Sequence, residues 1–404
     1  MVIRKFRYTI IILVILTIVT SCEQEIEFPD LARTSLGEPN GKRSFPTIGS
    51  FTYGGFAVEQ IGKYASDSTE GFLGNPLPIS SSKSIISTKK GKILGTTYAT
   101  IDWEYQLKNN SFVVAPVATD KEGNIFALTS EFKIISLNDE GAFRFEVTIP
   151  TPFRYESFHE LLSTTKGILV QSSHGYMTLI STNGSKLWER IDKTVRTPYP
   201  CSIENDFIAW FKVPVDESKE STIDITSLIN SEQKTIAISK NLEILHSPLW
   251  EGPSLVLLGI ENAKNFCKSI SVTNSTNWEN NEIPMVPKSI SISDSGVIVI
   301  GSYQPGAAEY RTCITVLSAN GKLLWRKFFD HRIASPVLLS KNDFVFLGTS
   351  TFTSGLYFLD YYGKFIGSLP ISDRVIPHFK LGVSPSGSIV LGTHQTLQLL
   401  RTRN

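Results

Sequence analysis

The hydrophobic positions of the chain fall in short runs separated by Gly, Asn, Asp and Ser. The clearest unit is Asp294–Phe329, which contains a glycine-bounded apolar run (Gly296–Gly301) and an alternating run (Thr312–Leu317). A polar turn (Ala319–Lys322) then opens a further apolar run at Leu323–Trp325. Short alternating runs between turn residues are typical of β-strands. No segment has a sustained 3.6-residue apolar stripe, so we expect few helices.

Weaker copies of this unit recur along the chain. When the units are aligned on their last strand, aromatic or apolar markers fall at positions 103, 143, 188, 236, 278, 325 and 366, in steps of 40, 45, 48, 42, 47 and 41 residues. A period in this range with short strands is the pattern of a β-propeller blade. The sequence therefore predicts an all-β fold, a single β-propeller of four-stranded blades.

Turn residues support the same interpretation. Asn183-Gly184 and Asn320-Gly321 supply the positive φ angles that tight hairpins need. Polar-glycine turns are expected to open the second strand of several blades, at Lys90–Ile93, Glu122–Ile125, Lys166–Ile168, Ser295–Val297 and Ser386–Ile389. A small sheet cannot bury both of its own faces, so we expect the aromatic residues to fill the gaps between stacked blades.

The number of blades depends on how the ring closes. Seven final strands lie within the chain, and Phe379–Arg403 supplies only three strands of another blade. Phe51–Ile61 would supply its fourth strand, close the ring and remove the exposed sheet edges. We therefore predict eight blades, with seven as the alternative because the unit at 67–107 is abbreviated.

The N-terminus has the pattern of a targeting segment. Arg4, Lys5 and Arg7 precede the apolar run Thr9–Thr20, which is too short to cross a bilayer as a helix. The run leads into Val19-Thr20-Ser21-Cys22, which resembles the bacterial lipobox, in which a cysteine is lipidated. The alternative is an ordinary secretory signal with a chance cysteine. We predict a signal peptide (1–21), a flexible tether after lipidated Cys22 (22–43) and a propeller domain (44–404). The expected location is the bacterial outer membrane, on its periplasmic face or at the cell surface.

Charge and reactive residues narrow the chemistry. The 404 residues include 39 basic and 38 acidic side chains, so no phosphate-binding face and no nucleic-acid partner is expected. Cys201, Cys267 and Cys313 are far apart; they are either small buried residues or include one bridged pair. The six histidines are scattered without metal-ligand spacing. We predict no catalytic, cofactor-binding or metal-binding residue.

The unit tails have the form apolar-x-x-x-x-Gly-Lys-apolar-apolar-Trp, most clearly at Val316–Trp325. This pattern, over about residues 70–404, resembles the repeats of pyrroloquinoline-quinone-type propellers and is weak in 191–283. That superfamily includes quinoprotein alcohol dehydrogenases and a non-enzymatic lipoprotein of the outer-membrane barrel-assembly machinery. The resemblance implies the fold. The enzymes would also need a vicinal disulfide, a tryptophan floor and calcium ligands, and this sequence has no adjacent cysteines.

Function is expected at insertions that break the repeat, because a rigid scaffold holds such loops in place. The longest are Val213–Thr222, Gln304–Arg311 and Ser350–Ser354. Candidate partner-binding aromatics near them are Tyr303, Tyr310, Trp210 and Phe211, with core packing as the alternative. We predict a lipid-anchored, exported, non-catalytic scaffold that binds a protein partner or organises an envelope complex. The alternatives are an extracellular glycan- or ligand-binding module and a quinone-dependent dehydrogenase.

Overall fold

The computed structural model describes residues 50–53, 56–65, 72–80, 82–150, 158–229, 232–273, 275–293, 295–304, 312–329, 332–333, 338–340, 343–349, 354–371, 382–383, 388–392 and 396–403. Every regular element in these ranges is a β-strand. Within them, no helix has the length and apolar character needed to cross a membrane.

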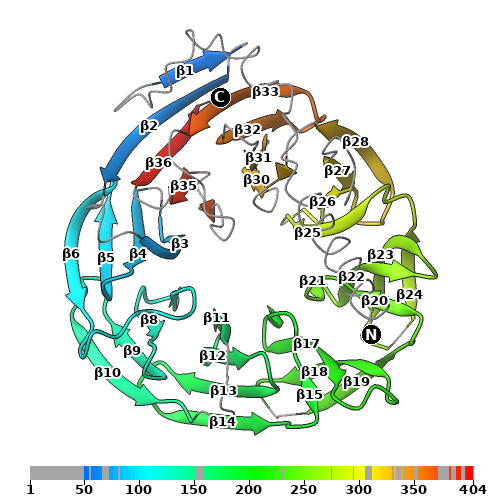
Figure 1. Cartoon of the computed structure of the whole chain (residues 1–404), viewed down its shortest axis with the longest axis horizontal. Coiled ribbons are helices and arrows are strands. Elements are labelled where there is room, and N and C mark those ends of the chain that lie inside the picture. The colour runs from blue at the N-terminus through cyan, green and yellow to red at the C-terminus, as the bar shows by residue number, and fades with distance from the viewer. Residues whose placement is uncertain are drawn as a thin grey trace, which may run out of the picture.

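Seven sheets are each built from one contiguous stretch of chain and follow one another around a ring (Figure 1). We number these blades in chain order. Blade 1 contains β3 (Phe72–Pro78), β4 (Lys83–Thr88), β5 (Lys92–Thr97) and β6 (Thr100–Gln106). Blade 2 contains β7 (Ala118–Thr119), β8 (Ile125–Leu128), β9 (Lys133–Leu137) and β10 (Phe143–Thr148). Blade 3 contains β11 (Phe158–Ser163), β12 (Gly167–Ser172), β13 (Tyr176–Ser181) and β14 (Lys186–Ile191).

Blades 4, 5 and 7 differ in that their innermost strand is split into two short pieces that pair with the same second strand. Blade 4 contains β15 (Val195–Arg196), β16 (Ser202–Glu204), β17 (Phe207–Pro214), β18 (Ser221–Ser227) and β19 (Gln233–Ile238). Blade 5 contains β20 (Leu242–Ile244), β21 (Leu249–Glu251), β22 (Ser254–Glu261), β23 (Lys264–Ser271) and β24 (Thr276–Asn280). Blade 6 contains β25 (Val286–Ile292), β26 (Ile298–Tyr303), β27 (Thr312–Leu317) and β28 (Leu323–Phe329). Blade 7 contains β29 (Arg332–Ile333), β30 (Leu338–Ser340), β31 (Asp343–Thr349), β32 (Ser354–Asp360) and β33 (Phe365–Ile371).

An eighth sheet combines the two ends of the described chain. It contains β1 (Ser50–Tyr53), β2 (Phe56–Ala65), β34 (Gly382–Val383), β35 (Ser388–Gly392) and β36 (Thr396–Arg403), in the order β1-β2-β36-β35-β34. The β2 strand runs antiparallel to β36, from Ala57 opposite Arg403 to Ala65 opposite Thr396. The prediction of an all-β, single propeller with four-stranded blades is confirmed. Seven blades are contiguous in the chain, which is the predicted alternative; the main prediction of eight differs from this count and would add the end-joining sheet as a further blade.

The seven predicted final strands are the outer strands of blades 1–7, as Figure 1 shows for β6, β10, β14 and β28. The polar-glycine turns open the second strands β8, β12 and β26 as predicted; β35 is also a second strand, and the Ser386 and Gly387 expected to precede it lie outside the described residues. The assignment of Lys90–Ile93 was wrong, because this turn opens β5, the third strand of blade 1. The abbreviated spacing of that unit hid β3, which lies upstream of it.

The hydrophobic core lies between blades rather than within them. One cluster joins Phe126 and Leu128 of blade 2 to Ile168 and Val170 of blade 3. Equivalent clusters join each following pair of blades up to blade 7. A single small sheet cannot bury its own faces, so stacking against both neighbours creates the core.

In five of the seven contiguous blades, one position in the outer strand seals the gap to the next blade. We call it the docking position. Its residue lies opposite a residue of the third strand, and that residue lies opposite a second-strand residue that packs against the next blade. The docking position is held by Trp103, Phe145, Trp188, Trp278 and Trp325 in blades 1, 2, 3, 5 and 6. All five side chains are half-buried. The predicted role of these aromatics in filling the gaps between blades is confirmed.

Four of the five docked aromatics lie against a glycine in the next blade's outer hairpin. A Cβ atom at Gly321, where φ is +76°, would lie 2.2 Å from Trp278. The same contact pairs Gly141 with Trp103 and Gly363 with Trp325. Two of these indoles also donate hydrogen bonds across the gap: Trp103 Nε1 to the Asp139 carbonyl at 3.0 Å, and Trp325 Nε1 to the Tyr361 carbonyl at 2.8 Å.

Candidate functional site

The docking position of blade 4 holds a lysine. Strand pairing places Lys234 opposite Ile225, which lies opposite Ala209 of the second strand. Lys234 is exposed, whereas the aromatics at the other docking positions are half-buried. In blade 7 the position is held by Gly367, next to the sheet that joins the chain ends. The seal between blades 4 and 5 is therefore missing.

This register corrects three of the repeat markers. The marker at 236 lies in the predicted outer strand but two residues beyond the docking position, because Lys234 is the residue opposite Ile225; Ile236 is 1% exposed and belongs to the core between blades 4 and 5. In blade 2 the docking residue is Phe145 rather than Phe143, since a β-bulge separates the two. In blade 7 it is Gly367 rather than Ile366. The pairing of backbone groups sets the position, and sequence spacing alone does not reveal it.

The hairpin that would receive the missing aromatic is also altered. The outer hairpins of blades 2, 3, 5, 6 and 7 share a turn closed by a hydrogen bond from its first N–H to its fifth carbonyl, at Asn138–Ala142, Ser181–Ser185, Ser271–Ser275, Ser318–Lys322 and Asp360–Lys364. The hairpin of blade 4, which receives Trp188, is longer, and its Ser227 N–H donates to the Glu232 carbonyl. The fourth residue is glycine in four of these turns. In the turn at 271–275 the fourth residue is Asn274, which lies outside the described residues. Blade 5 therefore lacks the glycine that accommodates the docked ring in blades 2, 3, 6 and 7.

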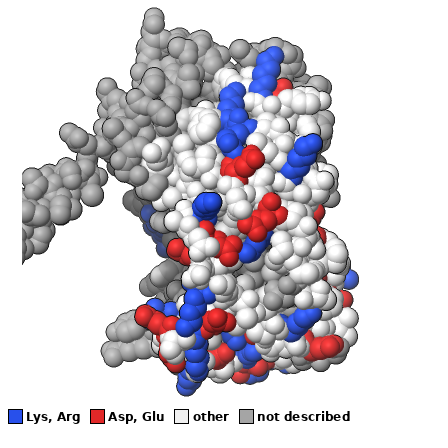
Figure 2. All heavy atoms as spheres, turned by 90° about the vertical axis from the view of Figure 1, so that its right-hand side faces the viewer, with Lys and Arg blue, Asp and Glu red and all other residues white. Residues whose placement is uncertain are grey.

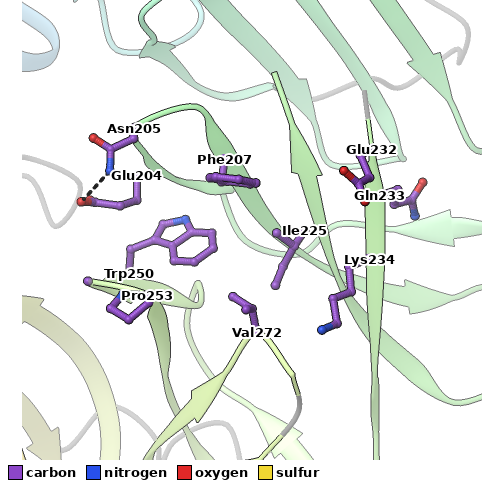
Figure 3. A pocket seen from close by; sticks show the side chains of 11 residues that line it. Glu204, Asn205, Phe207, Ile225, Glu232, Gln233, Lys234, Trp250, Pro253 and Val272 are labelled. Carbon is purple, nitrogen blue, oxygen red and sulfur yellow. Dashed lines mark hydrogen bonds between the residues drawn. The ribbon is translucent and has the colours of Figure 1, made fainter. Parts of the chain in front are cut away.

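A pocket of about 470 Å³ occupies this place between blades 4 and 5. We call it the inter-blade slot. Its apolar walls are Phe207, Ile225, Trp250, Pro253 and Val272. Its polar lining is Glu204, Asn205, Glu232, Gln233 and Lys234, together with the main chain of Gly252. Figure 3 shows Phe207, Trp250, Ile225 and Val272 facing one common space. The volume lies within the usual range of about 300–1,000 Å³ for ligand pockets.

Two aromatic side chains form the centre of the slot. Phe207 begins β17 and is 47% exposed. Its ring centroid lies 6.5 Å from that of Trp250, with the ring planes tilted by 52°. Trp250 belongs to blade 5, and its Nε1 donates a hydrogen bond to the Ser202 carbonyl of blade 4 at 3.3 Å. The two blades thus hold this aromatic pair in place, with one ring open to solvent.

The slot has an acidic side and a mixed side. Asn205 lies in the turn before β17 with a φ of +51°, and its amide nitrogen is 3.5 Å from the Glu204 carboxylate. Across the slot, Gln233 donates a hydrogen bond to Asp224 at 2.6 Å. Glu232 and Lys234 border that side (Figure 3). Apolar walls with a few polar groups at the rim are the usual composition of a binding pocket.

Behind the slot, a buried charge cluster stabilises blade 4. The carboxylate of Asp224, which is 1% exposed, lies at its centre. It accepts hydrogen bonds from Lys212 at 3.0 Å, Gln233 at 2.6 Å, Thr235 at 2.9 Å and Arg190 at 3.4 Å. Lys212 also lies 3.1 Å from Asp192. Burial alone would raise the pKa of Asp192, but hydrogen bonds from Thr194 and Lys212 outweigh it and lower the pKa. The cluster ties Gln233, which borders the slot, to blade 3.

The structure does not bring the predicted partner-binding aromatics together. Trp210 and Phe211 lie inside β17 and are 1% and 4% exposed, so core packing, the predicted alternative to partner binding, describes both of them. Arg190 and Lys212 each place a cationic group 4.9 Å from the Trp210 ring. Tyr303 ends β26 and is half-buried, with Lys288 Nζ 5.4 Å from its ring. Tyr310 and the predicted lipidation site Cys22 lie outside the described residues.

Sequence reasoning missed Phe207 and Trp250. Both lie in the stretch 191–283, where the repeat is weakest. The available signal was the absence of an aromatic from the outer strand of this unit, because the missing ring leaves space between blades 4 and 5. The region that departed most from the pattern contains the slot.

The reactive residues that were weighed from the sequence have structural roles. Cys201, Cys267 and Cys313 are buried thiols, which confirms their interpretation as small core residues. Burial raises the pKa of the Cys267 and Cys313 thiols above the usual range. His159 Nε2 lies 2.6 Å from the Thr197 carbonyl. Within the described ranges, no group of His, Cys, Asp and Glu is arranged to hold a metal ion.

Charges of both signs are mixed on the outer side of the ring. Figure 2 shows Lys and Arg beside Asp and Glu on the face that carries β23, β24 and β28. Several of these charges pair, as in Lys268 with Glu261 at 3.5 Å and Arg326 with Glu282 at 3.8 Å. This face therefore has no electrostatic potential of a single sign with which to select a partner, and shape and apolar contact are better suited to do so.

These features define a β-propeller with one unsealed gap between blades. No protein-family model matches the chain, and no curated protein sequence matches it. Among solved structures, it is similar to BamB from Moraxella catarrhalis, with 13% identity and a TM-score of 0.56, over 85% of this chain and 97% of that chain. It is also similar to the quinohemoprotein alcohol dehydrogenase from Comamonas testosteroni, with 10% identity and a TM-score of 0.62, over 85% of this chain and 76% of that chain. A chain of the Mitotic Checkpoint Complex matches with 12% identity and a TM-score of 0.53, over 90% and 94%. At these identities the likeness shows the fold alone. It is also the fold of the pyrroloquinoline-quinone-type propellers, whose repeats the sequence resembles.

Proposed function

We propose that this protein is a non-catalytic propeller scaffold that binds a protein partner. The observation that carries the proposal is the inter-blade slot, an open aromatic pocket in a ring that aromatics seal at five other positions. The fold supports the proposal, since it is also the fold of BamB and of a chain in the Mitotic Checkpoint Complex. Propellers serve many functions, so the slot carries more weight than the fold.

We further propose that the scaffold is exported and anchored by lipid at Cys22. The support is the sequence: a basic and apolar segment over 1–21, the lipobox-like Val19-Thr20-Ser21-Cys22, and a polar stretch over 22–43 that would act as a tether. On this proposal the propeller stands at the bacterial outer membrane, on the periplasmic face or at the cell surface. Metabolic labelling with a palmitate analogue tests it, since Cys22→Ser should abolish incorporation. Labelling of the serine variant at the wild-type level would contradict it.

The ring is proposed to close as eight blades. The pairing of β2 with β36 supports this, because it adds an N-terminal strand to the sheet that contains the last three strands of the chain. Closure of this kind gives the last blade a partner strand from the start of the domain and leaves no open sheet edge between the chain ends.

Affinity purification tests the scaffold function. The full-length chain, captured from detergent-solubilised envelopes of cells that express it at native level, should recover a partner in stoichiometric amount. The recovery should survive high salt, because the charges on the described outer face are mixed and the slot is largely apolar. Repeated captures that recover no stoichiometric protein would contradict a scaffold role.

Glycan binding is the second candidate function. An exposed aromatic ring beside carboxylate and amide groups, as in Phe207 with Glu204 and Asn205, is also suited to an apolar sugar face and its hydroxyls. A glycan array probed with the purified chain tests it. Binding that is lost in Phe207→Ala would favour this candidate over the protein scaffold.

A further inference from the structure

We propose that the inter-blade slot receives an aromatic side chain from a partner polypeptide, which completes from outside the seal that the other blades form internally. This inference rests on the proposed scaffold function and names how the partner is recognised. The repeat itself indicates the occupant. At the docking positions of blades 1, 2, 3, 5 and 6, the outer strand places an aromatic ring against the next blade. At blade 4 the strand supplies an exposed lysine, and the space stays open.

The walls of the slot suit an aromatic ring. Trp250 and Phe207 present tilted faces 6.5 Å apart, and Ile225 and Val272 line the same space. Aromatic rings favour tilted or offset contacts with other rings, with centroids about 4.5–7 Å apart. Phe207 is 47% exposed, so a side chain from another molecule can reach the pair.

A hydrogen-bond acceptor is expected at the corresponding place. The indoles of Trp103 and Trp325 donate to the carbonyl of the second residue in the receiving turn, Asp139 and Tyr361 respectively. The residue at that place in the 271–275 turn is Val272, which lines the slot. A tryptophan from the partner would find its acceptor there. We therefore expect tryptophan to be preferred over phenylalanine.

The acidic side of the slot adds a second element of recognition. Glu204 and Glu232 border the slot, against the single positive charge of Lys234. A partner segment with a basic residue near its aromatic anchor would complement this balance, and one with acidic neighbours would be disfavoured. The occupant is thus a polypeptide segment with an aromatic anchor and a neutral or basic flank.

A peptide selection tests the inference without knowledge of the natural partner. The probe is a library of random short peptides displayed on phage and selected on the immobilised full-length chain. Counter-selection uses Lys234→Trp, in which the chain's own indole should occupy the slot. We expect the recovered peptides to share an aromatic residue, most often tryptophan, at one aligned position. Recovered peptides without a shared aromatic would overturn the inference.

Two variants make the result specific to the slot. Replacing the shared aromatic of a selected peptide by alanine should weaken binding about thirtyfold, the loss expected for a hot-spot side chain. Lys234→Trp should weaken binding of the unchanged peptide by a similar factor. Lys234→Ala, which leaves the slot open, should bind within about threefold of wild type, as expected for an exposed rim charge. Circular dichroism and the melting temperature establish that each variant is folded.

The outcomes separate this inference from the scaffold function. If the envelope capture recovers the same stoichiometric partner with wild type and with Lys234→Trp, the scaffold function stands and the slot inference is wrong. If wild type recovers no partner, the scaffold function itself is contradicted. If peptides bind only after deletion of residues 23–43, the chain's own N-terminal segment occupies the slot and the partner inference is overturned.

Discussion

The contact between Trp278 and Gly321 gives the sharpest test of how the blades are joined. Gly321 lies in the outer hairpin of blade 6 at a φ of +76°, and a Cβ there would approach Trp278 Cε3 to 2.2 Å. Gly321→Ala therefore combines a backbone penalty with a clash against a docked ring. Gly252→Ala is the matched control, because Gly252 has a φ of +57° and no atom within 4 Å of the added methyl group.

The two effects can be estimated separately. An L-residue in the left-handed region costs about 1–2 kcal/mol, and both variants incur this cost. The clash forces Trp278 out of its half-buried position, which costs about 2 kcal/mol, taken as half of the loss for deleting a fully buried tryptophan. We expect Gly321→Ala to lower the free energy of unfolding by about 3–4 kcal/mol from these two terms. Gly252→Ala should lower it by about 1–2 kcal/mol from the backbone term alone.

Equilibrium unfolding in urea, followed by far-ultraviolet circular dichroism, measures these differences. A double-mutant cycle with Trp278→Ala isolates the contact, since Gly321→Ala should then cost only its backbone term. The expected coupling energy is about 2 kcal/mol, typical of residues in direct contact. Equal destabilisation by Gly321→Ala and Gly252→Ala, or additive effects in the double variant, would refute the docking of Trp278 on Gly321.

Three further predictions concern the charge cluster, the thiols and the ring. Asp224→Ala should lower the free energy of unfolding by about 3–5 kcal/mol, because it leaves the nearly buried Lys212 charge without its closest partner. Urea unfolding measures this loss, and a loss below about 1 kcal/mol, the value of a surface ion pair, would contradict the prediction. Cys201, Cys267 and Cys313 should resist iodoacetamide in the native protein and react after unfolding, since all three are buried and burial raises the pKa of the Cys267 and Cys313 thiols. Mass spectrometry detects the adducts, and rapid labelling of the native protein would argue against this packing. Deleting residues 44–65 should lower the melting temperature, because the deletion removes β2, the strand that pairs with β36. An unchanged melting temperature would contradict ring closure by β2.

The fold could be predicted because its signal repeats. Outer-strand markers at Trp103, Trp188, Trp278 and Trp325 recur with the blade, and each is a docking residue in the structure. Glycines after polar residues mark hairpins because few other residues adopt positive φ without strain. Repetition makes each weak local signal count several times, so the architecture was predictable even though the sequence matches no family model.

The candidate site could not be predicted in the same way, because it depends on register. Lys234 and Ile236 are two residues apart in one strand and lie on the same face of it, and only the backbone pairing tells which one holds the docking position. For a related reason, the sequence could not decide between partner binding and core packing for Trp210 and Phe211. They are adjacent in a second strand whose two faces both pack against neighbouring blades, Trp210 toward blade 3 and Phe211 toward blade 5. Alternation along the strand therefore exposes neither of them.

The binding of a selected aromatic peptide to three forms of the full-length chain tests the central claim most directly. Isothermal titration would compare wild type, Lys234→Ala and Lys234→Trp with the same peptide. We predict that wild type and Lys234→Ala bind with similar affinity, and that Lys234→Trp binds about thirtyfold more weakly because its own indole fills the slot. Equal affinity for all three folded forms would contradict the claim that the gap between blades 4 and 5 is the binding site.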